Sequence, residues 1–405
     1  MTSNTRVVVI GAGLAGVSLA RRLGELGTPT LLVGEEEHRP YNRVLLAEVL
    51  AGRYAPEVIA LPAPAGLVRA RVTGIDRAAR EVRCADGSVI PYGTLVLATG
   101  SNPVLPPLRG LFTPDHELPE GVHAFRTMDD CLGLSKAVRP GMRTVVIGGG
   151  LLGVSAARAL AVRGAQVVLA QQSERLMERQ LDPNASSLVL RHLKDLGVEV
   201  HTECRVRDVR CVGGAVRSVE MADGYALDAD LVVLACGVHP RVGLAKDAGL
   251  AVHKGVLVDD ELRTSDPHIH AVGDCVQHDG TVYGLATPAL EQAEALARLL
   301  SGDAGARYTG TRSLTRLTLT GPDAPFDLAA FGETEPLPGD DVVQLADATR
   351  GTYRKVVVRD DRLVGGVLVG ELGTVGALAR AWEGAEPLPT DGGPLLHLLT
   401  NDGGS

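Results

Sequence analysis

The apolar positions of this chain fall in short, continuous runs that glycine-rich turns follow. Two such runs open the segments Val8–Leu23 and Val145–Leu160, and after each turn Leu, Ala and Arg recur at helical spacing. Short β-branched runs of this kind are typical of buried parallel strands. The two segments match at 12 of 16 positions, at a constant offset of 137 residues. The pattern therefore predicts a duplicated strand–turn–helix unit, two Rossmann-like halves and an α/β fold.

The glycines of both copies have the spacing of a phosphate-binding turn. In the G-x-G-x-x-G pattern the first glycine allows the tight turn, the second lets main chain approach a pyrophosphate, and the third lets helix pack on strand. The phosphates lie against the first residues of the helix. We therefore predict two dinucleotide sites, formed by Gly11, Gly13, Leu14, Ala15 and Gly16 and by Gly148, Gly150, Leu151 and Gly153.

The copies differ where an acidic residue about 20 positions on should bind the adenosine ribose. The first copy has Glu35 there, with Glu36 as the alternative register, whereas the second has the neutral Gln171 or Gln172. The first copy is thus predicted to bind FAD or NAD, and the second is a less complete site. Arg175 and Arg179 could accept a 2'-phosphate there, which leaves NADPH open beside NADH; alternatively they are solvated arginines at the start of a helix.

Three further strand-and-turn motifs follow the glycine turns. Tyr92–Pro107 contains Ala98, Thr99 and Gly100, Leu231–Arg241 contains Gly237, and Leu262–Cys275 ends a short strand in Gly273-Asp274. Together and in this order, the motifs resemble the FAD-dependent pyridine nucleotide-disulfide oxidoreductase family over about residues 5–390. The resemblance implies that the Ala98–Gly100 turn contacts FAD and that Asp274 hydrogen-bonds its ribityl chain.

Within this family the likeness is greatest to ferredoxin and rubredoxin reductases and to the flavin-binding N-terminal part of the assimilatory nitrite reductase large subunit. Residues 35–52, 173–200 and 352–371 carry it. It implies that Arg43 contacts FAD, and that Thr287, Pro288 and the following helix cover the pyrimidine side of the flavin. It also implies an FAD-dependent NAD(P)H oxidoreductase that passes electrons to ferredoxin, rubredoxin or a nitrite or nitrate reductase subunit.

Three positions depart from the family pattern. Ser155 replaces a glutamate near the nicotinamide, Gln171 replaces the ribose acid, and Glu48 stands where several ferredoxin reductases have a flavin-proximal lysine. Two other functions therefore stay open. One is an NAD(P)H oxidase or small-molecule reductase; the other is an FAD-bound scaffold subunit with a degenerate nicotinamide site.

The motifs also predict the domain organisation. We expect an FAD-binding domain from residues 1–112 and 240–310, an NAD(P)-binding domain from 113–239, a C-terminal α+β interface domain from 311–390, and a tail at 391–405. In the C-terminal part, Leu314–Thr320 alternates as a strand does, and a hairpin is expected around Asp360-Asp361.

Composition narrows the partners. The formal net charge is -9, and aromatic residues make up only 3%, so we expect neither nucleic acid nor a membrane surface as a partner. The six cysteines form no C-x-x-C motif, no metal site is predicted, and a start without a signal-like segment predicts a cytoplasmic protein. The oligomeric state stays open. An acidic reductase that meets an acidic ferredoxin would need a basic patch, for which we name Arg350, Arg354, Lys355 and Arg359, or Arg205, Arg207 and Arg210.

Overall fold

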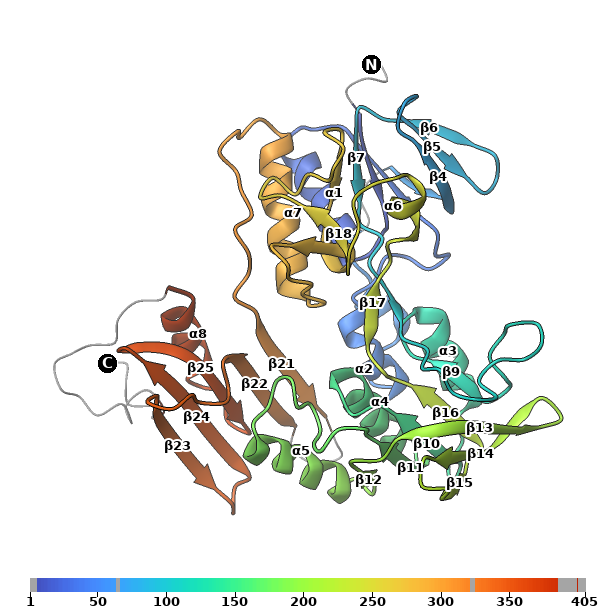
Figure 1. Ribbon diagram of the computed structural model, residues 1–405, viewed down its shortest axis with the longest axis vertical. Helices are drawn as coiled ribbons and strands as arrows, with labels where there is room; N and C mark the ends of the chain where they lie inside the picture. The colour runs from blue at the N-terminus through green and yellow to red at the C-terminus, as the bar shows by residue number, and fades with distance from the viewer. Residues whose placement is uncertain (1–5, 63–65, 321–324, 385–398, 400–405) are drawn as a thin grey trace.

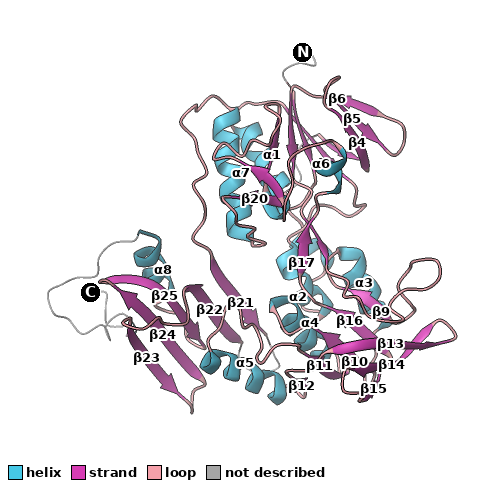
Figure 2. Ribbon diagram, in the orientation of Figure 1, coloured by secondary structure: helices cyan, strands magenta, loops and turns pink. Residues whose placement is uncertain are grey.

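The chain folds into three modules, each built on its own five-stranded sheet (Figure 1). The structure is a computed structural model that describes residues 6–62, 66–320, 325–384 and 399. In Figure 1 the first module lies at the top, the second at the lower right and the third at the lower left. Figure 2 shows that the first two modules mix helices with strands, whereas strands dominate the third.

The first module has a parallel sheet with the strand order β19-β7-β1-β2-β3. Alternate residues of β1 face opposite sides: Val7 and Val9 pack toward the helices α1 and α7, while Val8 and Ile10 pack toward β4–β6 and α6. Both faces are therefore covered, as the continuous apolar runs predict. The elements are β1 (Val7–Ile10), α1 (Leu14–Glu25), β2 (Thr30–Gly34), β3 (Leu67–Arg69), β4 (Val72–Asp76), β5 (Glu81–Cys84), β6 (Val89–Pro91), β7 (Thr94–Leu97), α6 (Gly243–Asp247), β18 (Val256–Val258), β19 (Ile269–Ala271), β20 (Val276–His278) and α7 (Ala286–Leu300).

The second module repeats this plan with the parallel order β12-β11-β10-β16-β9. Val146 and Val233 face the helices, and Val145 and Val232 face the antiparallel ribbon of β13–β15. The elements are β9 (Val122–Ala124), α3 (Met128–Ala137), β10 (Arg143–Ile147), α4 (Leu151–Val162), β11 (Gln166–Ala170), α5 (Pro183–Asp195), β12 (Glu199–His201), β13 (Val206–Val212), β14 (Ala215–Met221), β15 (Ala226–Asp228) and β16 (Leu231–Leu234). The predicted duplication and α/β fold are thus present.

The third module is an antiparallel sheet, β21-β22-β25-β24-β23, with α8 on one face. The expected hairpin joins β24 to β25, and Asp360 and Asp361 at its tip have φ values of 49° and 54°, as a two-residue type I' turn requires. Leu399, within the predicted tail, is fully buried under this sheet and accepts a hydrogen bond from Arg354; the other residues of 391–405 lie outside the described part. The elements are β21 (Leu314–Leu319), β22 (Phe326–Gly332), β23 (Asp341–Asp347), β24 (Thr352–Arg359), β25 (Arg362–Val369) and α8 (Val375–Gly384).

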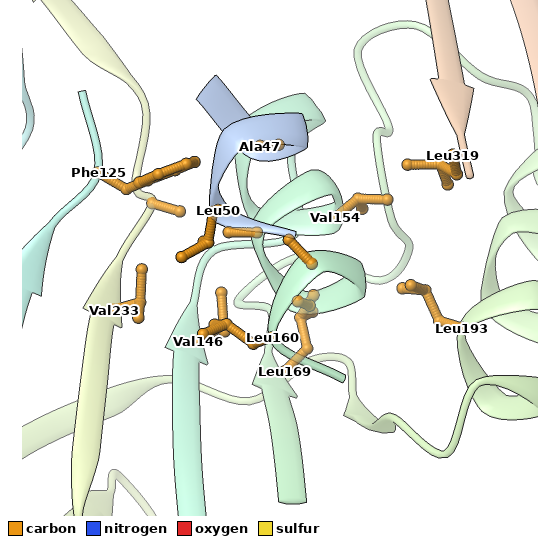
Figure 3. Packing of buried hydrophobic residues seen from close by; sticks show 14 of the residues in the cluster. Ala47, Leu50, Phe125, Val146, Val154, Leu160, Leu169, Leu193, Val233 and Leu319 are labelled. Carbon is orange, nitrogen blue, oxygen red and sulfur yellow. The ribbon is translucent and has the colours of Figure 1, made fainter. Parts of the chain in front are cut away.

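Two kinds of contact join the modules. The short antiparallel pair β8 (Ser101–Pro103) and β17 (Val238–Pro240) runs between the first and second modules. One apolar core also crosses from the second module to the third: Leu193 and Val154 of the second lie near Leu319 of β21 (Figure 3). The short helix α2 (Leu46–Leu50), whose sequence precedes both, supplies Ala47 and Leu50 to the same core.

The basic patch predicted around residues 350–359 is wrong. Lys355 is buried and donates to Asp182 Oδ2 at 2.9 Å, and Arg354 is buried against Leu399 and Glu371. The reason is that β24 is covered on both faces, by α5 on one side and by the third module's own core on the other. In the alternative patch Arg205, Arg207 and Arg210 are all exposed, and Arg207 and Arg210 both pair with Glu220; this patch stays a prediction.

Candidate flavin and nicotinamide site

Each of the two glycine turns leads into a long helix whose start has no side-chain cap. The helices α3 and α5 begin with side-chain caps: Thr127 accepts from the Asp130 N–H, and Asp182 accepts from the Ala185 N–H. The helices α1 and α4 begin at Gly13 and Gly150, and neither start has a side-chain cap. Their first N–H groups have no partner within the helix, so both starts can hold an anion.

The glycines of the first turn have the roles that their spacing predicts. Gly11 has φ +113°, and a Cβ there would lie 2.1 Å from the Ala98 carbonyl oxygen. A Cβ on Gly16 would lie 1.9 Å from the Gly11 carbonyl oxygen, whereas Gly13 faces open space. Turn and helix are therefore packed tightly together, and the middle glycine leaves room for a ligand.

The two candidate ribose acids have different surroundings. Glu35 follows β2 directly, is exposed, and pairs with Arg241. Glu36 instead accepts from both the Arg43 guanidinium and the Tyr41 hydroxyl. The Tyr41 pKa is raised, chiefly by burial. Glu35 is thus the better placed of the two for a ribose, and Glu36 fixes Arg43.

The Ala98–Gly100 turn lies at the junction of the first and second modules. Thr99 Oγ1 donates to the Arg241 carbonyl at 2.8 Å, and the Arg241 N–H donates to the Gly100 carbonyl at 2.9 Å. Arg241 also pairs with Glu35, so it links this turn to the candidate ribose acid. Gly237, the glycine of the corresponding second-module motif, has φ +97° and accepts from the Val104 N–H at 2.9 Å.

Asp274 lies in a polar cluster that the sequence does not reveal. Arg126 donates to its Oδ2 at 2.7 Å and Ser101 donates to the same oxygen at 2.9 Å. The preceding Gly273 packs so closely on Ala15 that a Cβ would lie 2.9 Å from the Ala15 Cβ. Asp274 is therefore held beside the first glycine turn. Because both bonds use Oδ2, the other carboxylate oxygen is available to accept from a ligand hydroxyl.

The helix α7 contacts this cluster through a hydrogen bond to Gly273. It begins at Ala286 without a side-chain cap, so Thr287 and Pro288 lie in its first turn. Gln292, six residues after Ala286 in the same helix, is buried, and its side chain accepts a hydrogen bond from the Gly273 N–H at 2.7 Å. The helix start, Gly273 and Asp274 thus form one structural unit.

The second glycine turn keeps the same backbone geometry. Gly148 has φ +110°, a Cβ on Gly153 would lie 1.7 Å from the Gly148 carbonyl oxygen, and Gly150 faces open space. Gln171 differs from an open ribose ligand, because its side-chain Oε1 accepts from the Gly149 N–H at 2.7 Å. This amide therefore closes over the turn.

The other two departures lie in buried surroundings. Ser155 donates back to the Leu151 carbonyl at 2.8 Å, within α4. Glu48 pairs with Arg158, which is fully buried and which also donates to Thr320 Oγ1 at 2.9 Å. Glu48 thus joins α2, α4 and the end of β21. Its partner lies 110 residues away in sequence, so no local signal indicates it.

The residues present fit an FAD molecule. The uncapped start of α1, the open approach at Gly13 and the available oxygen of Asp274 match a pyrophosphate and a hydroxylated chain. Arg126 Nε is buried and has no hydrogen-bond partner among the described residues, as expected of a donor that binds a ligand. Cys275 does not fit a redox role, because burial raises the pKa of its thiol.

Comparison with known proteins agrees with this geometry. The pyridine nucleotide-disulphide oxidoreductase model matches residues 5–293, and the rubredoxin NAD+ reductase C-terminal domain matches residues 318–383. The chain belongs to the pyridine nucleotide-disulphide oxidoreductase family. The predicted family, α/β fold and oxidoreductase class are confirmed, and the predicted cofactors, FAD with NADH or NADPH, are those of this family.

The share of each relative that aligns with this chain differs from one relative to the next. The chain is 32% identical over 379 residues to the assimilatory nitrate reductase electron transfer subunit of Bacillus subtilis (strain 168). This alignment covers 90% of this chain but 48% of that protein. It is 31% identical over 388 residues to the probable ferredoxin reductase CtmF of Castellaniella defragrans, with 90% of each chain covered. A crystal structure of a covalent putidaredoxin reductase–putidaredoxin complex has a TM-score of 0.85 at 26% identity, covering 98% of this chain and 99% of that one.

The chain therefore spans only 28% to 48% of the length of the nitrate and nitrite reductase relatives that it matches. Among the described residues, no helix combines the length and apolar character that a bilayer crossing requires. Within the same ranges no group of three or more His, Cys, Asp or Glu side chains could hold a metal ion.

Proposed function

We propose that this protein is an FAD-dependent NAD(P)H oxidoreductase that passes electrons from the nicotinamide coenzyme through FAD to a protein redox partner. The partner class is ferredoxin, rubredoxin or a subunit of a nitrite or nitrate reductase. We place the reaction in the assimilation of nitrite or nitrate and in the cytoplasm. The observation that carries the proposal is the pair of uncapped glycine turns, one beside the Asp274 cluster and one in the second module.

The proposal assigns roles to the residues of the first module. Gly11, Gly13 and Gly16 admit the pyrophosphate of FAD to the start of α1, and Glu35 accepts from its adenosine ribose. Asp274 accepts from the ribityl chain, while Arg126 and Ser101 hold this carboxylate in place. FAD, when bound, supplies the hydride and single-electron chemistry.

The cations near this site have an electrostatic role. Arg43 is held by Glu36 and Tyr41, and it also donates to the Arg126 carbonyl at 3.3 Å. Arg43, Arg126 and the uncapped start of α7 at Thr287 and Pro288 bring positive charge or positive dipole ends to the pyrimidine side. Such an environment favours a negatively charged ligand at that position.

The second module has the complementary role. Gly148, Gly150 and Gly153 admit the pyrophosphate of NAD(P)H to the start of α4. The relatives support a protein acceptor: one is an electron transfer subunit, another a probable ferredoxin reductase, and a third a reductase in complex with putidaredoxin. The missing C-x-x-C motif argues against disulfide reduction.

The test compares acceptors under anaerobic conditions. Purified protein is reduced with NADH or NADPH, and reoxidation of the flavin is followed after mixing with ferredoxin, with rubredoxin, or with oxygenated buffer. The proposal predicts that at least one protein acceptor reoxidises the flavin faster than oxygen does. Reoxidation by oxygen alone would favour the NAD(P)H oxidase alternative. A flavin that neither coenzyme reduces would favour the scaffold alternative.

A further inference from the structure

The position expected to bind the adenosine ribose of the coenzyme offers no carboxylate. Gln171 follows β11 directly, and its Oε1 already accepts from the Gly149 N–H at 2.7 Å. The next residue, Gln172, is exposed and also neutral. A Rossmann site that selects NADH uses an acid here to bind the 2'-hydroxyl. At this position the second module therefore has no acid that would favour NADH over NADPH.

An arginine lies in the same loop, and the loop is tied to the glycine turn. The Met177 N–H donates to the Gly149 carbonyl at 2.9 Å, and a Cβ on Gly149 would lie 2.6 Å from Leu176 Cδ2. Gln171 Nε2 donates to the carbonyl of Arg175 at 3.5 Å. The main chain of Arg175 therefore lies beside Gln171, the residue at the position expected to bind the ribose.

The Arg175 side chain is only partly satisfied. It pairs with Glu335, which lies in the third module between β22 and β23, while its Nε is buried without a hydrogen-bond partner among the described residues. Glu335 is 60% exposed and Arg175 is 24% exposed. An ion pair with one partner so exposed contributes little stability, so it can be exchanged for a stronger one.

We propose that Arg175 makes the second dinucleotide site selective for NADPH, by exchanging its ion pair with Glu335 for one with the 2'-phosphate of the coenzyme. The phosphate carries close to two negative charges at neutral pH and can accept two parallel N–H bonds from one guanidinium. The carboxylate of Glu335 carries only one negative charge, so it attracts the guanidinium less strongly. Glu335 acts as the competitor for Arg175 while no coenzyme is bound. This inference rests on the proposed function, because it names the coenzyme of that site.

The exchange gives opposite results for the two partners. Removing the arginine in Arg175→Ala should weaken NADPH binding about tenfold or more, the usual effect of losing a hydrogen bond to a charged group, and should leave NADH binding within about twofold. Removing only the competing charge in Glu335→Gln should tighten NADPH binding about two- to fivefold. Gln171→Glu should weaken NADPH binding and strengthen that of NADH.

The experiment measures the dissociation constants of NADPH and NADH from the concentration dependence of anaerobic flavin reduction, with the full chain and bound FAD. Arg350→Ala is the matched control, because Arg350 forms a surface pair with Asp347 at the other end of β23 from Glu335. We expect this control to bind both coenzymes as the unmodified protein does. Flavin content and thermal unfolding of every variant show whether the fold is kept.

The outcomes distinguish a failure of the inference about Arg175 from a failure of the proposed function. A wild-type preference for NADPH that Arg175→Ala abolishes and Glu335→Gln increases supports the exchange. If Arg175→Ala changes the binding of NADPH and NADH equally, or if the wild type prefers NADH, the inference is overturned and the proposed function stands. If neither coenzyme reduces the flavin of the wild type, the proposed function itself fails.

Discussion

The buried ion pair between Glu48 and Arg158 should be a main determinant of how the three modules hold together. Arg158 is fully buried, and its neighbours in the network are Glu48 and Thr320. Burial lowers the pKa of Arg158, and Glu48 opposes this effect. The carboxylate also accepts from Thr320 Oγ1 at 2.9 Å, and Arg53 lies 3.7 Å from it. Removing the carboxylate charge would leave a buried guanidinium without a counter-ion.

The magnitude follows from this geometry. Breaking a buried ion pair by removing one partner costs about 3–5 kcal/mol, because the remaining charge stays buried and unpaired. Glu48→Gln keeps one acceptor oxygen, so we expect the lower end, about 3 kcal/mol. Replacing the arginine as well, in Glu48→Gln with Arg158→Met, removes the stranded charge, so the double variant should be more stable than Glu48→Gln alone.

The assay is urea unfolding followed by tryptophan fluorescence. The chain has one tryptophan, Trp382, and it is buried in the third module against Phe331. Its emission therefore reports the third module, while flavin absorbance reports the first. Arg21→Gln is the control, because Arg21 and Glu25 form an exposed pair on α1 whose loss should cost less than about 1 kcal/mol. A loss of less than about 1 kcal/mol in Glu48→Gln, with additive effects of the two substitutions in the double variant, would show that the pair does not stabilise the fold in this way.

Two further predictions concern the first module. Gly13→Val should fold but lose FAD, because the new side chain meets open space in the protein and occupies the approach to the start of α1. Absorbance at the flavin band measures the FAD content. The control Gly24→Ala, whose new side chain also meets open space, should keep FAD. Burial, with the charge of Arg263 adding to it, lowers the His270 pKa from 6.5 to about 4. Below pH 6.5 the unfolded chain takes up a proton that the folded chain refuses, so stability should fall by about 3 kcal/mol between pH 6.5 and pH 4. Unfolding by urea at several pH values should show a shallower fall for His270→Gln, and an unchanged slope for that variant would contradict the assignment; His253→Gln, at an exposed site, is the control.

Local patterns predicted the parts of the fold that repeat. The duplicated apolar runs and glycines gave the two parallel sheets, because a buried strand followed by a phosphate-binding turn leaves a strong local signal. The alternation of Leu314–Thr320 and the turn at Asp360-Asp361 likewise gave two strands and a hairpin of the third module.

What the sequence did not reveal rests on contacts between distant segments. Arg126 reaches Asp274 across 148 residues and Gln292 reaches Gly273 from the next helix, so neither has a pattern of its own. The run that contains Arg354 and Lys355 looked like a solvated basic patch. Its burial depends on α5, whose Asp182 neutralises Lys355, and on Glu371, which pairs with Arg354. Tertiary packing decided these positions.

In the proposed reaction, NAD(P)H bound at the second glycine turn reduces the FAD bound at the first. Gly150→Val tests it most directly, because Gly150 faces open space, so the substitution should block the nucleotide without disturbing the packing. We expect this variant to keep its FAD and to be bleached by dithionite, whereas NADH and NADPH should no longer bleach it anaerobically as they do the wild type. Bleaching of Gly150→Val by NAD(P)H at the wild-type rate would contradict the proposed binding of the coenzyme at the second glycine turn.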